Sequence, residues 1–352
     1  MSRSDTRSHI LFALFATTLI VLGVLTFRAL VDVWLLTFGG ALAAIALHGL
    51  GREIATRTPL STELSVGLSV VAITAAAVAG LWSLGPAVVD GVGQLRERIP
   101  EALEQVRALL SDHPQLEGYV DEMTEKASES NPVSGRLGRL GSVFSTVFGV
   151  FSTLVGALTG LLVVVIVAVY GALRPGAYTG PFVSLLPARH KGRAREVLAE
   201  IAHALRWWLV GRGSSMLVVG ALTWVGLLLL GVPSAGTLAL IATLLSFVPN
   251  VGPVVSAVPA ILLGFSQSPS TALYVAALYV AVQSVESYVI TPLIQERVVA
   301  LPPASVIVVQ LAFGAAFGLL GLLFATPLAV VVMVLVQMLW IQDTLEQETE
   351  LP

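Results

Sequence analysis

Long apolar runs, each able to form a membrane-crossing helix, constrain this chain more than any other feature. Each run has about 18 to 21 residues, the length of an α-helix that crosses a hydrocarbon core of roughly 30 Å. Hydrophobic residues make up 56% of the chain and charged residues 12%, against about 45–50% and 25% in soluble domains. The sequence therefore predicts an all-α polytopic membrane protein, with early runs at residues 10–27, 33–50, 64–84, 154–173 and 214–232.

The distribution of charge predicts how these runs are oriented. Residues 174–212 hold seven of the nineteen Lys and Arg residues against two acidic residues, and such loops face the cytoplasm. Residues 86–139 carry ten acidic residues against six basic ones and are expected outside, as an amphipathic helical segment. Both termini are then cytoplasmic. Within the basic loop, residues 196–209 predict an interfacial helix anchored by Trp207 and Trp208 at headgroup depth.

Two further apolar regions are interrupted too strongly for one straight helix. Residues 237–265 contain Pro249 and Pro253, each of which removes a backbone donor and disfavours helical geometry before it. Residues 304–340 would measure roughly 55 Å as one helix and contain Gly318 and Pro327. Each region is expected to form either a re-entrant hairpin or a kinked span. Together with a full span at residues 271–290, this gives about eight transmembrane segments, two of them broken.

The two interrupted regions also resemble each other weakly. A Pro-Ser-Ala sequence ending at Ala235 precedes Pro259 by 24 positions, and a Pro-Pro-Ala sequence ending at Ala304 precedes Pro327 by 23. If both are hairpins, their tips are expected to meet near the midplane. Secondary transporters place their sites at such repeat interfaces, between half-helix ends and exposed carbonyls.

Glu286 is the strongest candidate for a functional residue, because a carboxylate inside a span is costly and usually faces a cavity, a partner or a proton path. Gln283 lies three positions earlier, on the same helix face. The alternative is a carboxylate near the end of a span, paired with Arg297 or another loop cation. Asn250 is expected to contact a solute or to cap a half-helix. The candidate pathway residues are Glu286, Gln283, Asn250, Pro249, Gly252 and Pro253, followed by Gln310, Gly318 and Pro327.

Several classes of function are disfavoured by what the sequence lacks. The chain has no cysteine and a net charge of -3, so it has no thiolate metal site, no cysteine nucleophile and no basic footprint for nucleic acid. No histidine cluster for a metal, no Walker motif and no hydrolase or protease motif occurs. We therefore expect a protein that is not an enzyme and that needs no cofactor.

Three motifs in the second half resemble those of the autoinducer-2 exporter family, also called the PerM-like permeases. They are Gly211-Arg212-Gly213-Ser214-Ser215; Phe247-Val248-Pro249-Asn250-Val251-Gly252-Pro253 followed by Pro259-Ala260; and Gln283-Ser284-Val285-Glu286 followed by Thr291-Pro292 and Pro302-Pro303. The first half resembles the family by pattern only. The resemblance implies a bacterial inner-membrane protein that forms homo-oligomers and exports a small solute, which is autoinducer-2 for some members. For other members it implies exchange of sodium or lithium for protons.

These observations predict a secondary transporter that exports a small polar solute, driven by a proton or sodium gradient. A Na+(Li+)/H+ antiporter is the alternative, and a membrane scaffold or assembly factor is the rival from another class. The expected parts are an N-terminal unit of three transmembrane helices (1–85), the external segment (86–141), a fourth helix (142–173), the basic loop (174–212), a C-terminal transport bundle (213–341) and an acidic tail (342–352).

Overall fold

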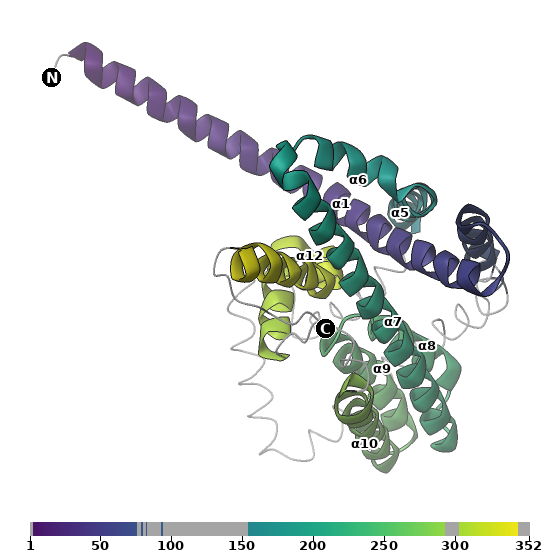
Figure 1. The fold of residues 1–352 in the computed structure, drawn as a ribbon. Helices are drawn as coiled ribbons and strands as arrows, with labels where there is room; N and C mark the ends of the chain where they lie inside the picture. Colours follow the sequence, from purple (N-terminus) through teal and green to yellow (C-terminus); the bar gives the residue numbers. More distant parts are fainter. Residues whose placement is uncertain are drawn as a thin grey trace.

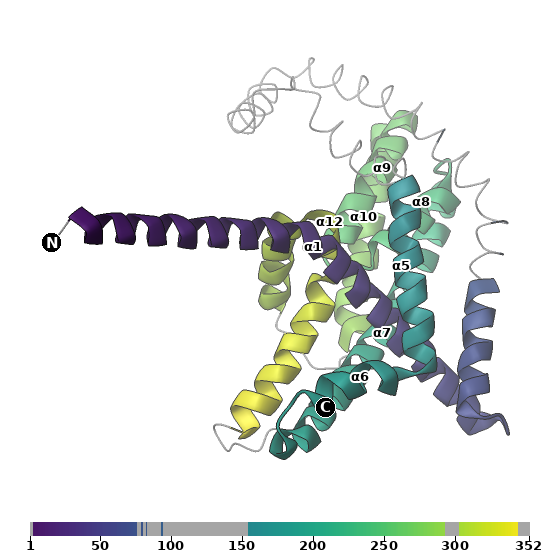
Figure 2. The ribbon, with the colours of Figure 1, turned by 90° about the horizontal axis from the view of Figure 1, so that it is seen from above.

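The computed structural model describes residues 3–75, 79, 82, 93, 154–292 and 303–343, and all regular secondary structure within them is helical (Figures 1 and 2). The all-α prediction is confirmed. Nearly all of the external segment 86–141 lies outside the described residues. Arg297 and the part of the acidic tail after Asp343 lie outside them as well.

The amino-terminal helix α1 (Arg3–Arg57) is one continuous helix of 55 residues. At 1.5 Å per residue it is about 80 Å long, and its first half projects away from the other helices (Figure 1). The expectation of two separate spans at residues 10–27 and 33–50 is wrong. Residues 28–32 contain neither proline nor glycine, so nothing in the sequence makes the chain turn there.

The next three α-helices with described bounds lie between residues 62 and 184. A short apolar helix, Thr62–Ala75, comes first. Helix α5 (Leu154–Leu173) has the bounds that the sequence predicts, and it packs beside the second half of α1. Helix α6 (Pro175–Ser184) begins after Arg174 and is bent by 84° from the end of α5. The sequence gave no indication of α6 as an element of its own.

Helix α7 (Lys191–Leu229) runs for 39 residues without a break. The expected interfacial helix at residues 196–209 and the expected span at 214–232 are therefore parts of one helix. The predicted headgroup position is wrong for Trp208. Trp208 is 9% exposed and packs edge-to-face against Phe247, with ring centroids 5.7 Å apart. Packing within the protein, rather than the headgroup region, therefore surrounds this ring. Trp207 is half-buried against the core that contains Trp208.

The first interrupted region forms a helical hairpin. Helix α8 (Ala235–Leu245) and helix α9 (Val251–Gln267) are joined by the tip loop, residues 246–250. Gln267 Nε2 donates to the carbonyl of Gly231 at 2.8 Å, so the two open ends lie together. Buried residues of both helices pack against helix α10 (Pro269–Val285), which continues as a π-helical turn, Glu286–Ile290. The expected break at Pro249 is confirmed.

The second interrupted region also doubles back. Helix α12 (Pro303–Leu335) contains a break at Gly318, where φ is +64° and ψ is -146°, a conformation that glycine adopts at little cost. Gln310 and Thr326, eight positions on either side of Gly318, are hydrogen-bonded across the two arms at 3.4 Å. The second arm continues as a π-helical segment, Val336–Gln342. Arg193 of α7 donates to the Asp343 carboxylate at 3.0 Å.

Helix α7 belongs to both main cores of the protein. One core joins α7 to α1 and to the second arm of α12, and the other joins it to α8, α9 and α10. Among the described residues four helices are long and apolar enough to cross a membrane, and the bent pair of α5 and α6 makes a fifth candidate. The expected eight spans are not confirmed. The four helices are Leu30–Arg57, Ala188–Leu229, Pro269–Ile290 and Ala304–Gln342.

Candidate functional site

Glu286 is buried at the end of α10, where the helix widens into its π-helical turn. The residue is 4% exposed. Its Oε1 accepts two hydrogen bonds from α7, one from Arg212 Nη1 at 2.8 Å and one from Ser215 Oγ at 2.7 Å. The Thr291 hydroxyl donates to the Glu286 carbonyl at 2.8 Å, a contact between residues five apart that fits the π geometry. The cation beside Glu286 therefore comes from a distant helix within the protein.

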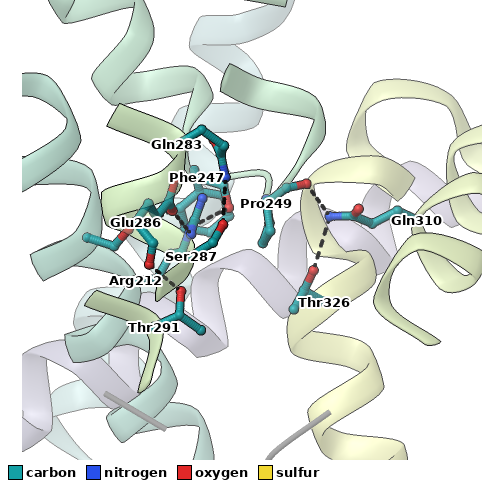
Figure 3. Close-up of polar contacts among 10 residues, drawn as sticks. Arg212, Phe247, Pro249, Gln283, Glu286, Ser287, Thr291, Gln310 and Thr326 are labelled. Atoms are coloured by element: carbon teal, nitrogen blue, oxygen red, sulfur yellow. Dashed lines mark hydrogen bonds and ion pairs between the residues drawn. The ribbon is translucent and has the colours of Figure 1, made fainter. Parts of the chain in front are cut away.

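Arg212 connects this carboxylate to the tip loop of the first hairpin. Its Nε donates to the carbonyl of Phe247 at 3.3 Å, while Nη1 binds Glu286 (Figure 3). The side chains of Arg212 and Glu286 are only 10% and 6% exposed. Because Arg212 lies on α7 between the two cores, its position is fixed by packing on both sides. One guanidinium thus joins α7, the end of α10 and the break between α8 and α9.

The ion pair leaves one polar atom of each partner unused. Among the described residues, neither Glu286 Oε2 nor Arg212 Nη2 has a hydrogen-bond partner, although both atoms are buried. A buried polar atom without a partner costs free energy, and such atoms in native structures mark strain, function or a bound water or ion. A carboxylate oxygen accepts a proton or coordinates a cation, and a guanidinium nitrogen donates to an oxygen of a solute.

A second polar contact holds the tip loop from the opposite hairpin. Gln310, on the first arm of α12, is 1% exposed and donates through Nε2 to the carbonyl of Pro249 at 3.0 Å (Figure 3). The same nitrogen lies 3.4 Å from Thr326 Oγ1 on the second arm. The two interrupted regions therefore touch, as the hairpin arrangement predicts, and Gln310 makes the contact. Pro327, next to Thr326, is fully buried.

Two residues at the junction of the tip loop and α9 have backbone positions that restrict which side chain fits there. Asn250 has a φ of +63°, which is uncommon outside glycine. Its side chain is exposed and makes no capping hydrogen bond, so the capping alternative is wrong. A Cβ on Gly252 would overlap the carbonyl oxygen of Leu245. Gly252 is therefore required for the close approach of α9 to the end of α8. The carbonyl of Pro253 accepts a hydrogen bond from Ser256 at 3.0 Å.

Gln283 lies beside the ion pair without joining it. Its Nε2 donates to Ser287 Oγ at 3.3 Å, and its Oε1 is buried without a partner among the described residues. Most of the residues singled out in the sequence thus gather around the tip loop, and Gly318 marks the reversal of α12. Arg212, Ser215 and Thr326 were not among the candidates. The Gly211–Ser215 motif was the available signal for the first two, since it carries part of the family resemblance.

The two broken helices meet beside a buried ion pair. This arrangement defines a class of helical membrane proteins that keep irregular backbone inside the protein, away from lipid. Comparison with known sequences gives the family. The family described as AI-2E family transporter matches residues 11–340. The chain belongs to this family, as the motifs predict, and it is a multi-pass membrane transporter.

Individual relatives carry names of the same kind. "Putative transport protein YueF" of Bacillus subtilis (strain 168) is 26% identical over 259 residues, which are 71% of this chain and 69% of that protein. "Putative transport protein YhhT" of Escherichia coli (strain K12) is 28% identical over 176 residues, 49% of each chain. "Putative transport protein YrrI" of Bacillus subtilis (strain 168) is 26% identical over 151 residues, 43% of each chain. The last two matches cover less than half of the relatives' length.

Proposed function

We propose that this protein is a secondary transporter of the bacterial inner membrane that exports a small polar solute, of the autoinducer-2 type, driven by a proton or sodium gradient. Both termini are cytoplasmic in this proposal, and the protein works as a homo-oligomer. The single observation that supports it most is the buried pair of Arg212 and Glu286, bonded to the tip loop and left with one unused atom on each partner.

The ion pair offers a physical route from ion binding to movement of the hairpin. Arg212 divides its hydrogen bonds between Glu286 and the carbonyl of Phe247. A proton or sodium ion on Glu286 weakens the attraction that holds Arg212 there. The guanidinium is then free to strengthen its contacts with the tip loop or with an oxygen of the solute. Because the pair is largely out of water, the change in attraction is far larger than at a protein surface.

The burial of Arg212 and Glu286 also favours a transporter over a scaffold. Removing two charges from water costs several kcal/mol per ion, and the pair regains this only with good geometry and further hydrogen bonds. Here two polar atoms remain unsatisfied, so the site is not optimised for stability alone. A scaffold has no use for such a cost. A transporter needs a charge that responds to an ion.

The test is accumulation of labelled autoinducer-2 in everted vesicles, with and without a protonophore. Wild type is compared with Glu286→Gln and with the double variant Arg212→Gln/Glu286→Gln, which removes both charges and leaves no unpaired ion. Glu53→Gln is the matched control, because Glu53 is a half-exposed carboxylate that is also paired with an arginine. We expect wild type and Glu53→Gln to accumulate solute only with the gradient, and the double variant to be stable but inactive.

The same vesicles test the alternative function, a Na+(Li+)/H+ antiporter, for which the buried carboxylate of Glu286 in the candidate span Pro269–Ile290 is the favouring observation. An antiporter dissipates the pH gradient when sodium or lithium is added, and the signal disappears in the double variant. If neither solute accumulation nor the cation response exceeds that of empty vesicles, the proposed solute and the proposed cations are both wrong. The scaffold function is then favoured.

A further inference from the structure

Helix α6 has few contacts within the described part of the protein that would stabilise it. It has ten residues and includes Gly176, Gly180 and Pro181, a composition that disfavours helix formation, and isolated helices of this length are marginal in water. Apart from its chain neighbours and the backbone of α6 itself, neither glycine has an atom within 4 Å of where a Cβ would lie, and Val183 is the one buried residue of the helix. Little within the described part of the protein therefore stabilises α6 as a helix.

One face of α6 is apolar and exposed. Tyr178, Phe182 and Leu185 are 58%, 61% and 84% exposed, and their spacing of four and three residues places them on one side of the helix. Val183 points in another direction, toward the protein. Exposed aromatic and leucine side chains grouped in this way mark a surface that binds something apolar.

The orientation of α6 fits a membrane surface. Helix α5 has 20 residues, about 30 Å, and is long enough to cross the hydrocarbon core without α6. The bend of 84° then lays α6 nearly parallel to the bilayer plane, at the end of α5 (Figure 2). Tyrosine is favoured at this depth because it combines an apolar ring with a polar hydroxyl, and Tyr178 supplies such a ring.

Basic residues stand at both ends of the helix. Arg174 immediately precedes α6, and Arg189 follows Leu185 by four positions. Both side chains are exposed, and neither forms an ion pair with any described residue. A basic flank on an interfacial helix attracts the anionic headgroups of phospholipids.

We propose that α6 is an in-plane membrane anchor that inserts Tyr178, Phe182 and Leu185 into the headgroup boundary and binds anionic phospholipids through Arg174 and Arg189. The anchor holds the start of α7, which carries Arg212 further along, at a fixed depth relative to the bilayer. This assignment is independent of the solute and of the coupling ion.

The chain has no cysteine, so single-cysteine variants of the full-length protein report depth directly. Phe182→Cys and Ser184→Cys are each labelled with an NBD fluorophore and reconstituted into phosphatidylcholine vesicles containing phosphatidylglycerol. Phe182 lies on the apolar face, whereas Ser184 lies on a different, exposed face and is the matched control. Lipids with nitroxides at the headgroup, or at shallow or deep acyl positions, then quench the fluorophore.

We expect shallow nitroxides to quench the label at position 182 most strongly and the label at position 184 to remain accessible to aqueous quenchers. Strongest quenching of position 182 by the deep nitroxide would mean that α5 and α6 form one broken span, and the proposal would fall. Equal aqueous accessibility at the two positions would mean that α6 does not touch the membrane.

The electrostatic part is tested with spin-labelled phosphatidylglycerol and phosphatidylcholine as competing quenchers of the label at position 182. Replacing Arg174 or Arg189 by Gln is expected to reduce the preference for phosphatidylglycerol about fivefold per arginine at low salt. Arg52→Gln, an exposed arginine on α1, is the control and leaves the preference unchanged. An unchanged preference in the Arg174→Gln/Arg189→Gln variant would refute the lipid-binding role of these arginines.

Discussion

The ion pair of Arg212 and Glu286 should dominate the local stability of the transport bundle, and a double-mutant cycle measures its contribution. Glu286→Gln removes the acceptor of two hydrogen bonds, from Arg212 and Ser215, and leaves the guanidinium buried without a counter-charge. Breaking a buried pair in this way costs about 3–5 kcal/mol. Arg212→Gln leaves the carboxylate unpaired and should cost a similar amount.

The double variant Arg212→Gln/Glu286→Gln should cost no more than either single variant, since no unpaired charge remains. The magnitude of the coupling energy of the cycle is then at least about 3 kcal/mol, at or above the upper limit for residues in contact. The free energy of unfolding is measured for purified protein in mixed micelles by titration with a denaturing detergent, with helix content as the readout.

A second cycle on Arg57 and Glu53 isolates the effect of burial. Its N–O distance is 2.7 Å against 2.8 Å for Arg212 and Glu286, but its side chains are 75% and 47% exposed. Surface pairs of this kind have coupling energies of about 0.3–0.5 kcal/mol. Equal coupling energies in the two cycles would refute the argument that burial makes the Arg212 pair a responsive site.

Two further predictions concern the hairpins. Gly252→Ala should destabilise the protein by about 1–3 kcal/mol, because the methyl group of the alanine would overlap the carbonyl of Leu245. In the control, Gly67→Ala, the methyl group meets nothing, so this variant should be neutral or more stable by up to about 1 kcal/mol. Equal effects of the two substitutions on the melting temperature would contradict this prediction. Gln310→Ala should cost about 0.5–1.5 kcal/mol, because the part-buried carbonyl of Pro249 loses its side-chain donor and keeps only the Val251 N–H. Gln267→Ala removes a similar but exposed hydrogen bond to Gly231 and should cost less; the same unfolding measurement decides between them.

The parts of the structure that were predictable from sequence are those fixed by local chemistry. Two prolines within five residues exclude a continuous helix, so the break at Pro249 followed from sequence alone. Gly318 and the length of the last apolar region indicated either a kink or a reversal for the same kind of reason, and the structure shows the reversal. Glu286 was recognisable because a carboxylate inside an apolar span requires a partner.

The parts that were not predictable depend on contacts between distant segments. Arg212 and Glu286 are 74 positions apart. No pattern in the sequence near either residue indicates that the two form an ion pair. Trp208 has the composition signature of a headgroup anchor, yet it packs against Phe247 because α7 continues through the centre of the protein. Helix α6 was hidden within a basic loop, since its glycines and prolines favour a turn over a helix.

The hydrogen bonds of the tip loop also determine when during synthesis the first hairpin becomes complete. Arg212 leaves the ribosome before Phe247, so the donor for that carbonyl is already made. The donor for Pro249, Gln310, follows 61 residues later, which takes about 3–12 s at a rate of roughly 5–20 residues per second. Until then this carbonyl keeps only its local hydrogen bond from the Val251 N–H, at 2.7 Å. The contact between the two interrupted regions therefore forms only after α12 has been made.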